Sequence, residues 1–179
     1  MRIISGLYKG RRISAPSTIT ARPTTDFAKE GLFNVLNNLI DFEDIDVLDL
    51  FSGTGGISFE FVSRNCRQAI SVEQNDRHCT FIRKVCTDLK ITNLQLVKTD
   101  VFRYVKSCSL NFDLIFADPP YELTNIEEIP DLIFKKNILK PDGLFILEHS
   151  VINDFSNHPN FENKRNYGNV NFSFFRQTT

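Results

Sequence analysis

The sequence lacks any long run of apolar residues. None of its hydrophobic stretches approaches the roughly 18 residues that a membrane-spanning helix needs, and residues 1–12 lack the apolar core of a secretory signal. We therefore expect no membrane partner and a cytoplasmic protein. The 179 residues are 41% hydrophobic and 24% charged, which is ordinary for a soluble globular chain with one domain and a sizeable core.

Cysteine is scarce, and its spacing is not that of a metal or redox site. The four cysteines are Cys66, Cys79, Cys86 and Cys108, and no two of them form a C-x-x-C pair. Zinc ribbons and dithiol redox motifs use such pairs. We expect these cysteines to be reduced packing residues, and we expect no bound metal ion.

A large excess of charge of one sign is also missing, since the net charge is −1. This argues against a protein that coats nucleic acid with its whole surface. The charge is unevenly distributed, because residues 1–25 carry five basic and no acidic side chains, whereas the remainder carries 16 basic and 22 acidic ones. The five are Arg2, Lys9, Arg11, Arg12 and Arg22. They predict a local grip on phosphate groups, with a solvated arm that has no partner as the alternative.

The first 40 residues are expected to form an extension of the main domain. Residues 2–14 alternate around Gly6 and Gly10, which is typical of a β-hairpin or small ribbon. After a polar connector, Thr25 or Asp26 can cap a helix whose apolar residues recur at helical spacing. Residues 41–179 are expected to form the catalytic core. We expect this helix to lie as a lid across one mouth of a crevice in that core.

Strand and helix patterns alternate between residues 45 and 149. Apolar runs predict strands at residues 45–50, 69–73, 94–99, 112–117 and 144–149, and helical patterns separate several of them. Two more runs, at residues 164–167 and 170–176 around Gly168, predict a terminal hairpin. The alternation predicts an α/β fold with a doubly wound, mostly parallel sheet, whose ligands bind at the carboxyl ends of the strands.

The strand at residues 112–117 leads directly into the motif Asp118-Pro119-Pro120-Tyr121. Two prolines fix φ and remove two backbone donors, so the chain is stiff where the strand ends. Asp118 and the carbonyl of Pro119 could accept both N–H groups of an exocyclic amine, while Tyr121 stacks on the ring that carries it. The lone pair of the amine would then face an electrophile. An ordinary Pro-Pro turn after a strand is the alternative.

A glycine-containing loop, D-L-F-S-G-T-G-G, follows the first strand at residues 49–56. Gly53 and Gly55 permit a tight turn and a close approach of the backbone to a ligand. With Glu73 twenty residues after Gly53, the loop also matches half of a dinucleotide-binding pattern, although Ser58 replaces its third glycine. Asp49 suits a cationic amino acid better than a pyrophosphate. The loop is therefore less suited to a nicotinamide dinucleotide than to a ligand with a cationic amino acid group.

Two further acids follow neighbouring strands. Glu73 ends the second strand, where a carboxylate can accept both hydroxyls of a ribose. Asp100 follows the third strand and by itself would be an ordinary helix cap. For Glu73 the alternative is a solvated residue at the end of the strand.

These motifs, in this order, resemble those of amino-directed, S-adenosylmethionine-dependent methyltransferases, which combine D-x-F-x-G-x-G with (D/N)PP(Y/F/W). The segment R-P-T-T-D-F-A-K-E-G-L-F-N at residues 22–34, and the basic R-I-I-S-G-L-Y-K-G-R-R-I before it, are similar to the opening of bacterial 16S ribosomal RNA guanine-N2 methyltransferases of the RsmD type. The resemblance covers residues 2–176. It implies the Rossmann-like, seven-stranded class I methyltransferase sheet, with a last strand inserted antiparallel.

The resemblance also implies the site residues, with S-adenosylmethionine as the cofactor. Donor-binding residues would be Asp49, Phe51, Gly53, Gly55, Glu73, Gln74, Asp100 and Val101. Catalytic residues would be Asp118, Pro119, Pro120 and Tyr121. Residues that bind RNA would be Arg2, Lys9, Arg11, Arg12, Arg22, Thr24 and Thr25.

The substrate implied is the N2 amine of a guanine in ribosomal RNA, within the small subunit or one of its assembly intermediates, and we expect a monomeric enzyme. Adenine N6 or cytosine N4 of DNA, or transfer RNA, are alternative substrates. A nicotinamide-dependent oxidoreductase and a noncatalytic RNA-binding module are the alternatives from other classes.

Overall fold

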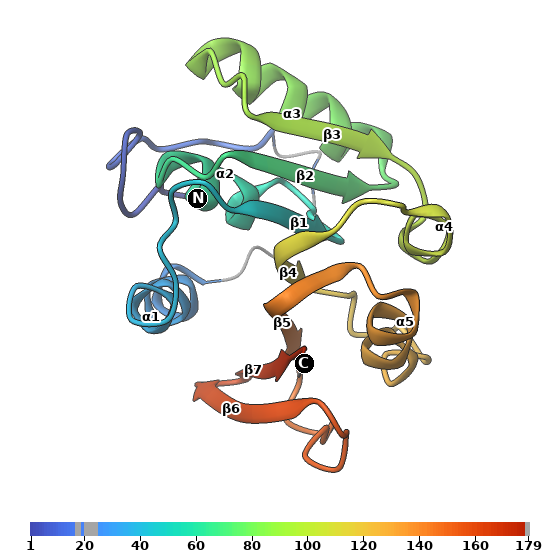
Figure 1. Ribbon diagram of the computed structural model, residues 1–179. Coiled ribbons are helices and arrows are strands. Elements are labelled where there is room, and N and C mark those ends of the chain that lie inside the picture. Colours follow the sequence, from blue (N-terminus) through green and yellow to red (C-terminus); the bar gives the residue numbers. More distant parts are fainter. Residues whose placement is uncertain (17–18, 20–24, 178–179) are drawn as a thin grey trace.

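Seven strands form one sheet in the order β3-β2-β1-β4-β5-β7-β6 (Figure 1). The computed structural model describes residues 1–16, 19 and 25–177. The strands are β1 Asp46–Leu50, β2 Gln68–Glu73, β3 Leu94–Lys98, β4 Phe112–Ala117, β5 Leu139–His149, β6 Phe161–Tyr167 and β7 Val170–Arg176. The helices are α1 Asp26–Leu36, α2 Gly56–Ser63, α3 Asp76–Leu89, α4 Val101–Ser107 and α5 Glu128–Lys136.

The sheet has the doubly wound, mostly parallel topology that the sequence predicts. Strands β1 to β5 pair in parallel, whereas β7 is antiparallel to both β5 and β6. The terminal hairpin therefore inserts its last strand beside β5, as expected. Because β1 lies between β2 and β4, the winding reverses between β1 and β4. In such sheets this reversal opens a crevice at the carboxyl ends of the strands.

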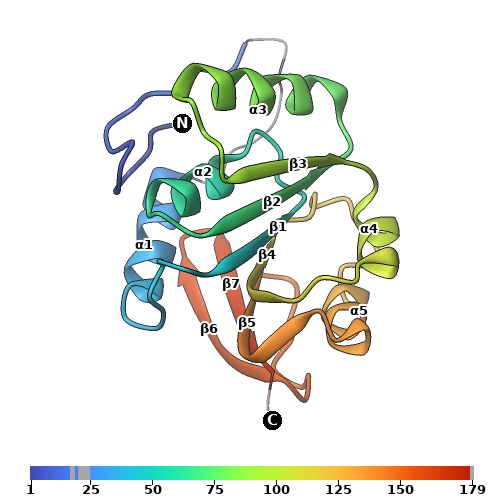
Figure 2. The same cartoon turned by 45° about the horizontal axis from the view of Figure 1, so that its top comes forward.

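Helices cover both faces of the sheet (Figure 2). Side chains of α1, α2 and α3 pack on one face, in a cluster that includes Leu114 and Phe116 of β4. Side chains of α4 and α5 pack on the other face, with Ile115 and Ala117 of the same strand. Successive residues of a strand point to opposite faces, which explains why β4 is apolar on both faces apart from Asp113 near its start.

Helix α1 begins as the sequence predicts and packs on the core. The Thr25 hydroxyl accepts a hydrogen bond from the Ala28 N–H at 3.2 Å, so Thr25 is the cap. Leu32 and Leu36 are fully buried in the cluster shared with α2 and the sheet. The side chains that α1 buries therefore attach it to the core, and its place as a lid over the crevice stays a prediction.

Residues 1–13 form the expected antiparallel ribbon. The Ile3 N–H donates to the Arg11 carbonyl at 3.0 Å, and the Ile13 N–H donates to the Met1 carbonyl at 2.9 Å. Ile3 and Ile13 are buried in the core cluster of α1 and α2. The ribbon is therefore part of the packed structure.

Strand β5 starts five residues before its predicted start at residue 144. Phe112 pairs with Leu139 and Leu114 pairs with Leu144, so extra residues bulge out of the ladder between the two pairs. The bulge includes Asp142, which has a φ of 60°. The predicted turn at residues 141–143 is thus an irregularity inside a longer strand.

Among the described residues, no helix has the length and apolar character that crossing a membrane requires.

Candidate active site

The loop between β1 and α2 is held in an unusual backbone conformation. Phe51, Gly53 and Gly55 have φ values of 59°, 53° and 80°. A Cβ atom on Gly55 would come within 2.9 Å of the Phe59 ring, whereas one on Gly53 would meet nothing closer than the Phe51 carbonyl at 3.9 Å. Gly55 is thus required by packing, and the space beside Gly53 is open to a ligand.

Glu73 connects the end of β2 to this loop. Its Oε2 atom accepts from the Gly53 N–H at 2.7 Å, and its Oε1 atom accepts from the Asn75 N–H at 2.8 Å. The residue is 8% exposed. Since a carboxylate oxygen has two acceptor sites, each oxygen can accept a further hydrogen bond. The sequence-based alternative of a solvated residue does not describe Glu73.

Asp49 lies beneath the same loop and is only 1% exposed. Its Oδ2 atom accepts from the Ser58 N–H at 3.0 Å and from the Ser58 hydroxyl at 2.5 Å. Burial raises the pKa of Asp49 to about 7, because the hydrogen bonds from Ser58 offset the lost hydration only in part and the charge of Glu73 raises it further. A carboxyl group with this pKa exchanges its proton near neutral pH.

The other predicted donor residues lie along the same edge of the sheet. The Asp100 carboxylate accepts from the Arg103 N–H at 2.9 Å, so this exposed residue caps α4. Val101 is buried, and the Phe51 ring stands edge-on to Phe102 with centroids 6.4 Å apart. Gln74 is exposed. Capping uses one oxygen of the Asp100 carboxylate, so the other oxygen can still accept a hydrogen bond.

The motif at residues 118–121 adjoins the glycine loop directly. The Asp118 N–H donates to the carbonyl of Leu50, the last residue of β1, at 3.3 Å. Asp118 is half-buried, Pro119 is buried and Tyr121 is 50% exposed. The two motifs that the sequence separates by more than 60 residues therefore meet at the reversal of the sheet.

The residues predicted to bind RNA are divided between two environments. Arg2 is paired with Glu30 at 2.9 Å and with Asp26 at 3.8 Å. Thr25 serves as the cap of α1, while Arg22 and Thr24 lie outside the described residues. Three further side chains are exposed and make no salt bridge with any residue that the structure describes. They are Lys9, Arg11 and Arg12.

The ribbon runs along the length of α2. Near its open end, the Met1 sulfur lies 3.3 Å from where a Cβ atom on Gly56 would stand. At its turn, the Leu7 N–H donates to the Ser63 carbonyl at 2.6 Å. Gly56 and Ser63 are the first and last residues of α2, so the turn of the ribbon is at the end of α2 remote from the glycine loop.

A buried ionic cluster, which sequence reasoning missed, joins the ribbon to two helices. Glu60 is fully buried and pairs with Lys29 of α1 at 3.1 Å and with Arg64. It also accepts from the Ile4 N–H of the ribbon at 2.8 Å. An acid inside the apolar run I-S-F-E-F-V at residues 57–62 was the available signal.

Among the described residues, no group of three or more potential ligands could hold a metal ion.

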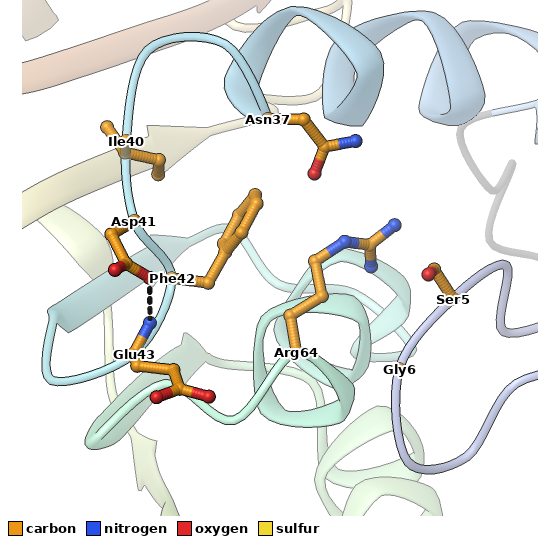
Figure 3. A pocket seen from close by; sticks show the side chains of 8 residues that line it. All are labelled: Ser5, Gly6, Asn37, Ile40, Asp41, Phe42, Glu43 and Arg64. Atoms are coloured by element: carbon orange, nitrogen blue, oxygen red, sulfur yellow. Dashed lines mark hydrogen bonds between the residues drawn. The ribbon is translucent and has the colours of Figure 1, made fainter.

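A hollow of about 500 Å³ lies near the amino ends of the strands, where the loop before β1 meets the end of α2 (Figure 3). The Arg64 side chain projects into it, with its guanidinium 4.1 Å from the centre of the Phe33 ring. Because Arg64 follows the last residue of α2, this hollow is at the opposite end of the helix from the glycine loop. It does not belong to the crevice described above.

Comparison with known proteins shows which family the chain belongs to. A family model described as "Conserved hypothetical protein 95" matches residues 1–176. The chain belongs to this family. Ribosomal RNA small subunit methyltransferase D of Buchnera aphidicola (subsp. Baizongia pistaciae) is 33% identical over 161 residues, which are 89% of this chain and 82% of that protein. The Escherichia coli K12 protein of the same name is 30% identical over 159 residues, or 89% and 79%.

Solved structures agree with this membership. The Escherichia coli protein yhhF superposes with a TM-score of 0.86 at 26% identity, covering 99% of this chain and 98% of that one. The family is the RsmD/YhhF family of class I methyltransferases, whose methyl donor is S-adenosylmethionine. An RNA methyltransferase of Salinibacter ruber, solved with S-adenosyl-L-homocysteine, shares the fold with a TM-score of 0.69 at 12% identity. The membership confirms the resemblance seen in the sequence at the level of RsmD/YhhF-type class I methyltransferases, together with the expected cofactor, S-adenosylmethionine.

Proposed function

We propose that this protein transfers a methyl group from S-adenosylmethionine to the N2 amine of a guanine in small-subunit ribosomal RNA. One observation carries the proposal: the backbone hydrogen bond from Asp118 to Leu50 joins the amine-binding motif to the donor loop. A methyl group held over the loop would therefore lie next to an amine held by the motif. The names of the two relatives support the choice of RNA.

The residues of the glycine loop fit the proposed donor. The space beside Gly53 is open, and the buried Ser52 hydroxyl has no hydrogen-bond partner among the described residues. We assign Asp49 to the ammonium of the methionyl end and Glu73 to the ribose hydroxyls. Asp100 would receive the adenine amine, with Val101 beside the ring. When bound, S-adenosylmethionine supplies an electrophilic methyl group on a sulfonium.

The residues of the 118–121 motif would hold the acceptor. Asp118 and the Pro119 carbonyl accept the two N–H bonds of the guanine amine and so aim its lone pair. The base must leave its stack to enter, and Tyr121 replaces the lost stacking. Because a guanine amine is a poor nucleophile, catalysis would rest on alignment and on these preorganised acceptors, without a covalent enzyme intermediate.

The rest of the chain would serve this reaction as one methyltransferase domain. The exposed cations Lys9, Arg11 and Arg12 lie on a ribbon that flanks α2, the helix that follows the donor loop. Such cations bind phosphates without reading sequence. They would thus hold the RNA backbone while the 118–121 motif selects the amine.

The test is to give the purified protein labelled S-adenosylmethionine together with unmodified ribosomal RNA, small-subunit particles, transfer RNA and DNA. The expected result is label on one guanine N2 of the small-subunit RNA, mapped by nuclease digestion and mass spectrometry. Label on adenine N6 or cytosine N4, or on transfer RNA or DNA alone, would overturn the proposed substrate. Donor binding without transfer to any nucleic acid would overturn the proposed activity.

A further inference from the structure

A chain of buried hydroxyl groups ends on Asp49. Ser71 of β2 is paired in register with Asp49 of β1, and Ser58 of α2 lies over both strands. Both serines are fully buried. The two hydroxyl oxygens are 2.5 Å apart, and the Ser58 hydroxyl is 2.5 Å from the Asp49 Oδ2 atom. None of the three groups can exchange this contact for water without opening the core.

The direction of these hydrogen bonds follows from the number of protons. A hydroxyl group has one hydrogen to donate, and Ser58 directs its hydrogen to Asp49. The bond between the two serines must then be donated by Ser71. Together with the Ser58 N–H, the chain presents hydrogen-bond donors to one carboxylate oxygen, which favours the ionised form of Asp49 and fixes its rotamer.

No cation balances this carboxylate among the residues that the structure describes. The charged group that acts on it from β2 is Glu73, which is also acidic. On α3, His78 faces Glu73 at 3.6 Å. On α2, the acid Glu60 is already paired with Lys29 and Arg64. At the end of β4, Asp118 adds a further acid to this edge of the sheet.

We propose that the Ser71–Ser58 hydroxyl chain holds Asp49 as the receiver of the donor's ammonium group, and that donor binding is coupled to release of one proton from Asp49. The inference rests on the donor site proposed above. In the donor-free protein, Asp49 holds its proton below about pH 7. Arrival of the ammonium favours the carboxylate, so the proton leaves Asp49 for the buffer. Ser58 and Ser71 act as positioning residues, since neither has to touch the donor.

The experiment measures the affinity of the full chain for S-adenosylhomocysteine by calorimetry from about pH 5 to pH 7.5, where an α-amino group remains largely protonated. We expect the affinity to fall about tenfold per pH unit below about pH 7. At pH 6 we expect the binding heat, compared in two buffers of different ionisation enthalpy, to report release of about one proton per donor. Methylthioadenosine has the adenosine but no ammonium, so its affinity should stay within about twofold.

The serine variants separate a positioning role from a merely structural one. Ser58→Ala should move the pH midpoint upward by about one unit, because the carboxylate loses its charge-assisted hydrogen bond, and Ser71→Ala should move it less in the same direction. Ser63→Ala is the matched control. It removes another buried hydroxyl from α2, one that bonds Ser5 and Tyr8, and should leave the midpoint unchanged.

Each other outcome has a definite meaning. If Ser58→Ala weakens binding equally at every pH, or if methylthioadenosine shows the same pH dependence, the coupling to Asp49 is wrong although the donor site stands. If Asp49→Asn binds S-adenosylhomocysteine as tightly as the natural protein at pH 7.5, the assignment of Asp49 in the donor site is wrong. Failure of methyl transfer to RNA with these binding results intact overturns only the proposed substrate.

Discussion

The position of Asp118 is fixed by its backbone, since its N–H group donates to β1 at 3.3 Å whatever the side chain. Asp118→Ala should therefore keep the fold and the donor affinity. It should lower the rate of methyl transfer by about a hundredfold or more, the scale of losing one preorganised electrostatic partner. Single-turnover methylation and calorimetry with S-adenosylhomocysteine measure the two effects separately. A variant with undiminished transfer would contradict the role of Asp118.

Residues at strand ends were easier to predict than their partners. Glu73 ends an apolar run, Asp118 follows one, and Asp49 is the last residue but one of a predicted strand, so the pattern places all three near one edge of a parallel sheet. Ser58 and Ser71 carry no such signal, because each is a small polar residue within an apolar stretch. Their contact with Asp49 depends on strand register and on the position of α2, neither of which a local pattern encodes.

At the scale of elements, the ribbon has a structural role besides the proposed binding of RNA. Ile3 and Ile13 are buried, and the Ile4 N–H bonds the buried Glu60. Deleting residues 1–14 would remove these three residues and destabilise the core. A deletion that abolished RNA binding could then reflect either the lost basic side chains or the lost packing. Substitution of the exposed charges tests the role in binding without that ambiguity.

Replacing Lys9, Arg11 and Arg12 with glutamine should weaken RNA binding without changing donor affinity. For each phosphate that the variant no longer neutralises, the slope of log affinity against log salt should fall by about 0.7 for a single strand. Filter binding at several salt concentrations measures this slope. The matched control replaces Lys106, Lys135 and Lys136, which are exposed on α4 and α5, and should leave the slope unchanged. Equal effects of the two triple variants would refute a specific role for the ribbon.

The packing of α1 against β6 depends on a glycine. A Cβ atom on Gly31 would lie 2.1 Å from the Tyr167 ring. Gly31→Ala should destabilise the protein by about 1–3 kcal/mol through overpacking. In a Tyr167→Ala background the same change should stabilise by about 1 kcal/mol, because alanine favours the helix. Urea unfolding of the four proteins measures the cycle, and the same sign in both backgrounds would exclude the clash.

Regular elements followed from the sequence, and irregular ones did not. The first four strands were predicted within one or two residues, since each is a short apolar run bounded by polar residues. The start of β5 was missed because Pro141, Asp142 and Gly143 are typical turn residues. In the structure the ladder bulges around them and resumes, which requires the neighbouring strand β4 and cannot be inferred from composition.

At the scale of the whole molecule, the ionised Asp49 carboxylate, the form proposed to bind the donor, lowers the free energy of unfolding. Its pKa is raised in the folded chain, from 3.8 to about 7. The stability that this group contributes is therefore present below about pH 4 and is lost as the pH rises through 7. Asp49→Asn removes the charge and keeps the acceptor for Ser58. The donor-free variant should melt about 5 °C or more above the natural protein at pH 8, and close to it at pH 4.

Calorimetric melting at the two pH values, with and without S-adenosylhomocysteine, provides the measurement. At one fixed concentration, S-adenosylhomocysteine should raise the melting temperature of the natural protein at pH 8 by more than it raises that of Asp49→Asn, because the variant binds the ligand more weakly. A variant that melts below the natural protein at both pH values would show that the Asp49 carboxylate stabilises the fold.

The alternation of strands and helices predicted the parallel part of the sheet, and the family resemblance supplied the rest of the topology. Alternation implies a parallel sheet, but the place of β7 between β5 and β6 came from the resemblance. The packing of α1 against the sheet could not be inferred, because its buried Lys29 has the appearance of a solvent-facing residue. Lys29 is buried because Glu60 pairs with it at 3.1 Å, from a helix position 31 residues further along the chain.

The attachment of the ribbon to α2 also has a consequence for the newly made protein. Its hydrogen bonds to Glu60 and Ser63 join residues 55 to 58 positions apart in the chain. At a synthesis rate of about 5–20 residues per second, the ribbon must wait about 3–12 seconds for its anchor to be translated. During that interval the nascent chain carries its basic segment unfolded, and a chaperone or protease would meet that segment before the finished enzyme hides its isoleucines.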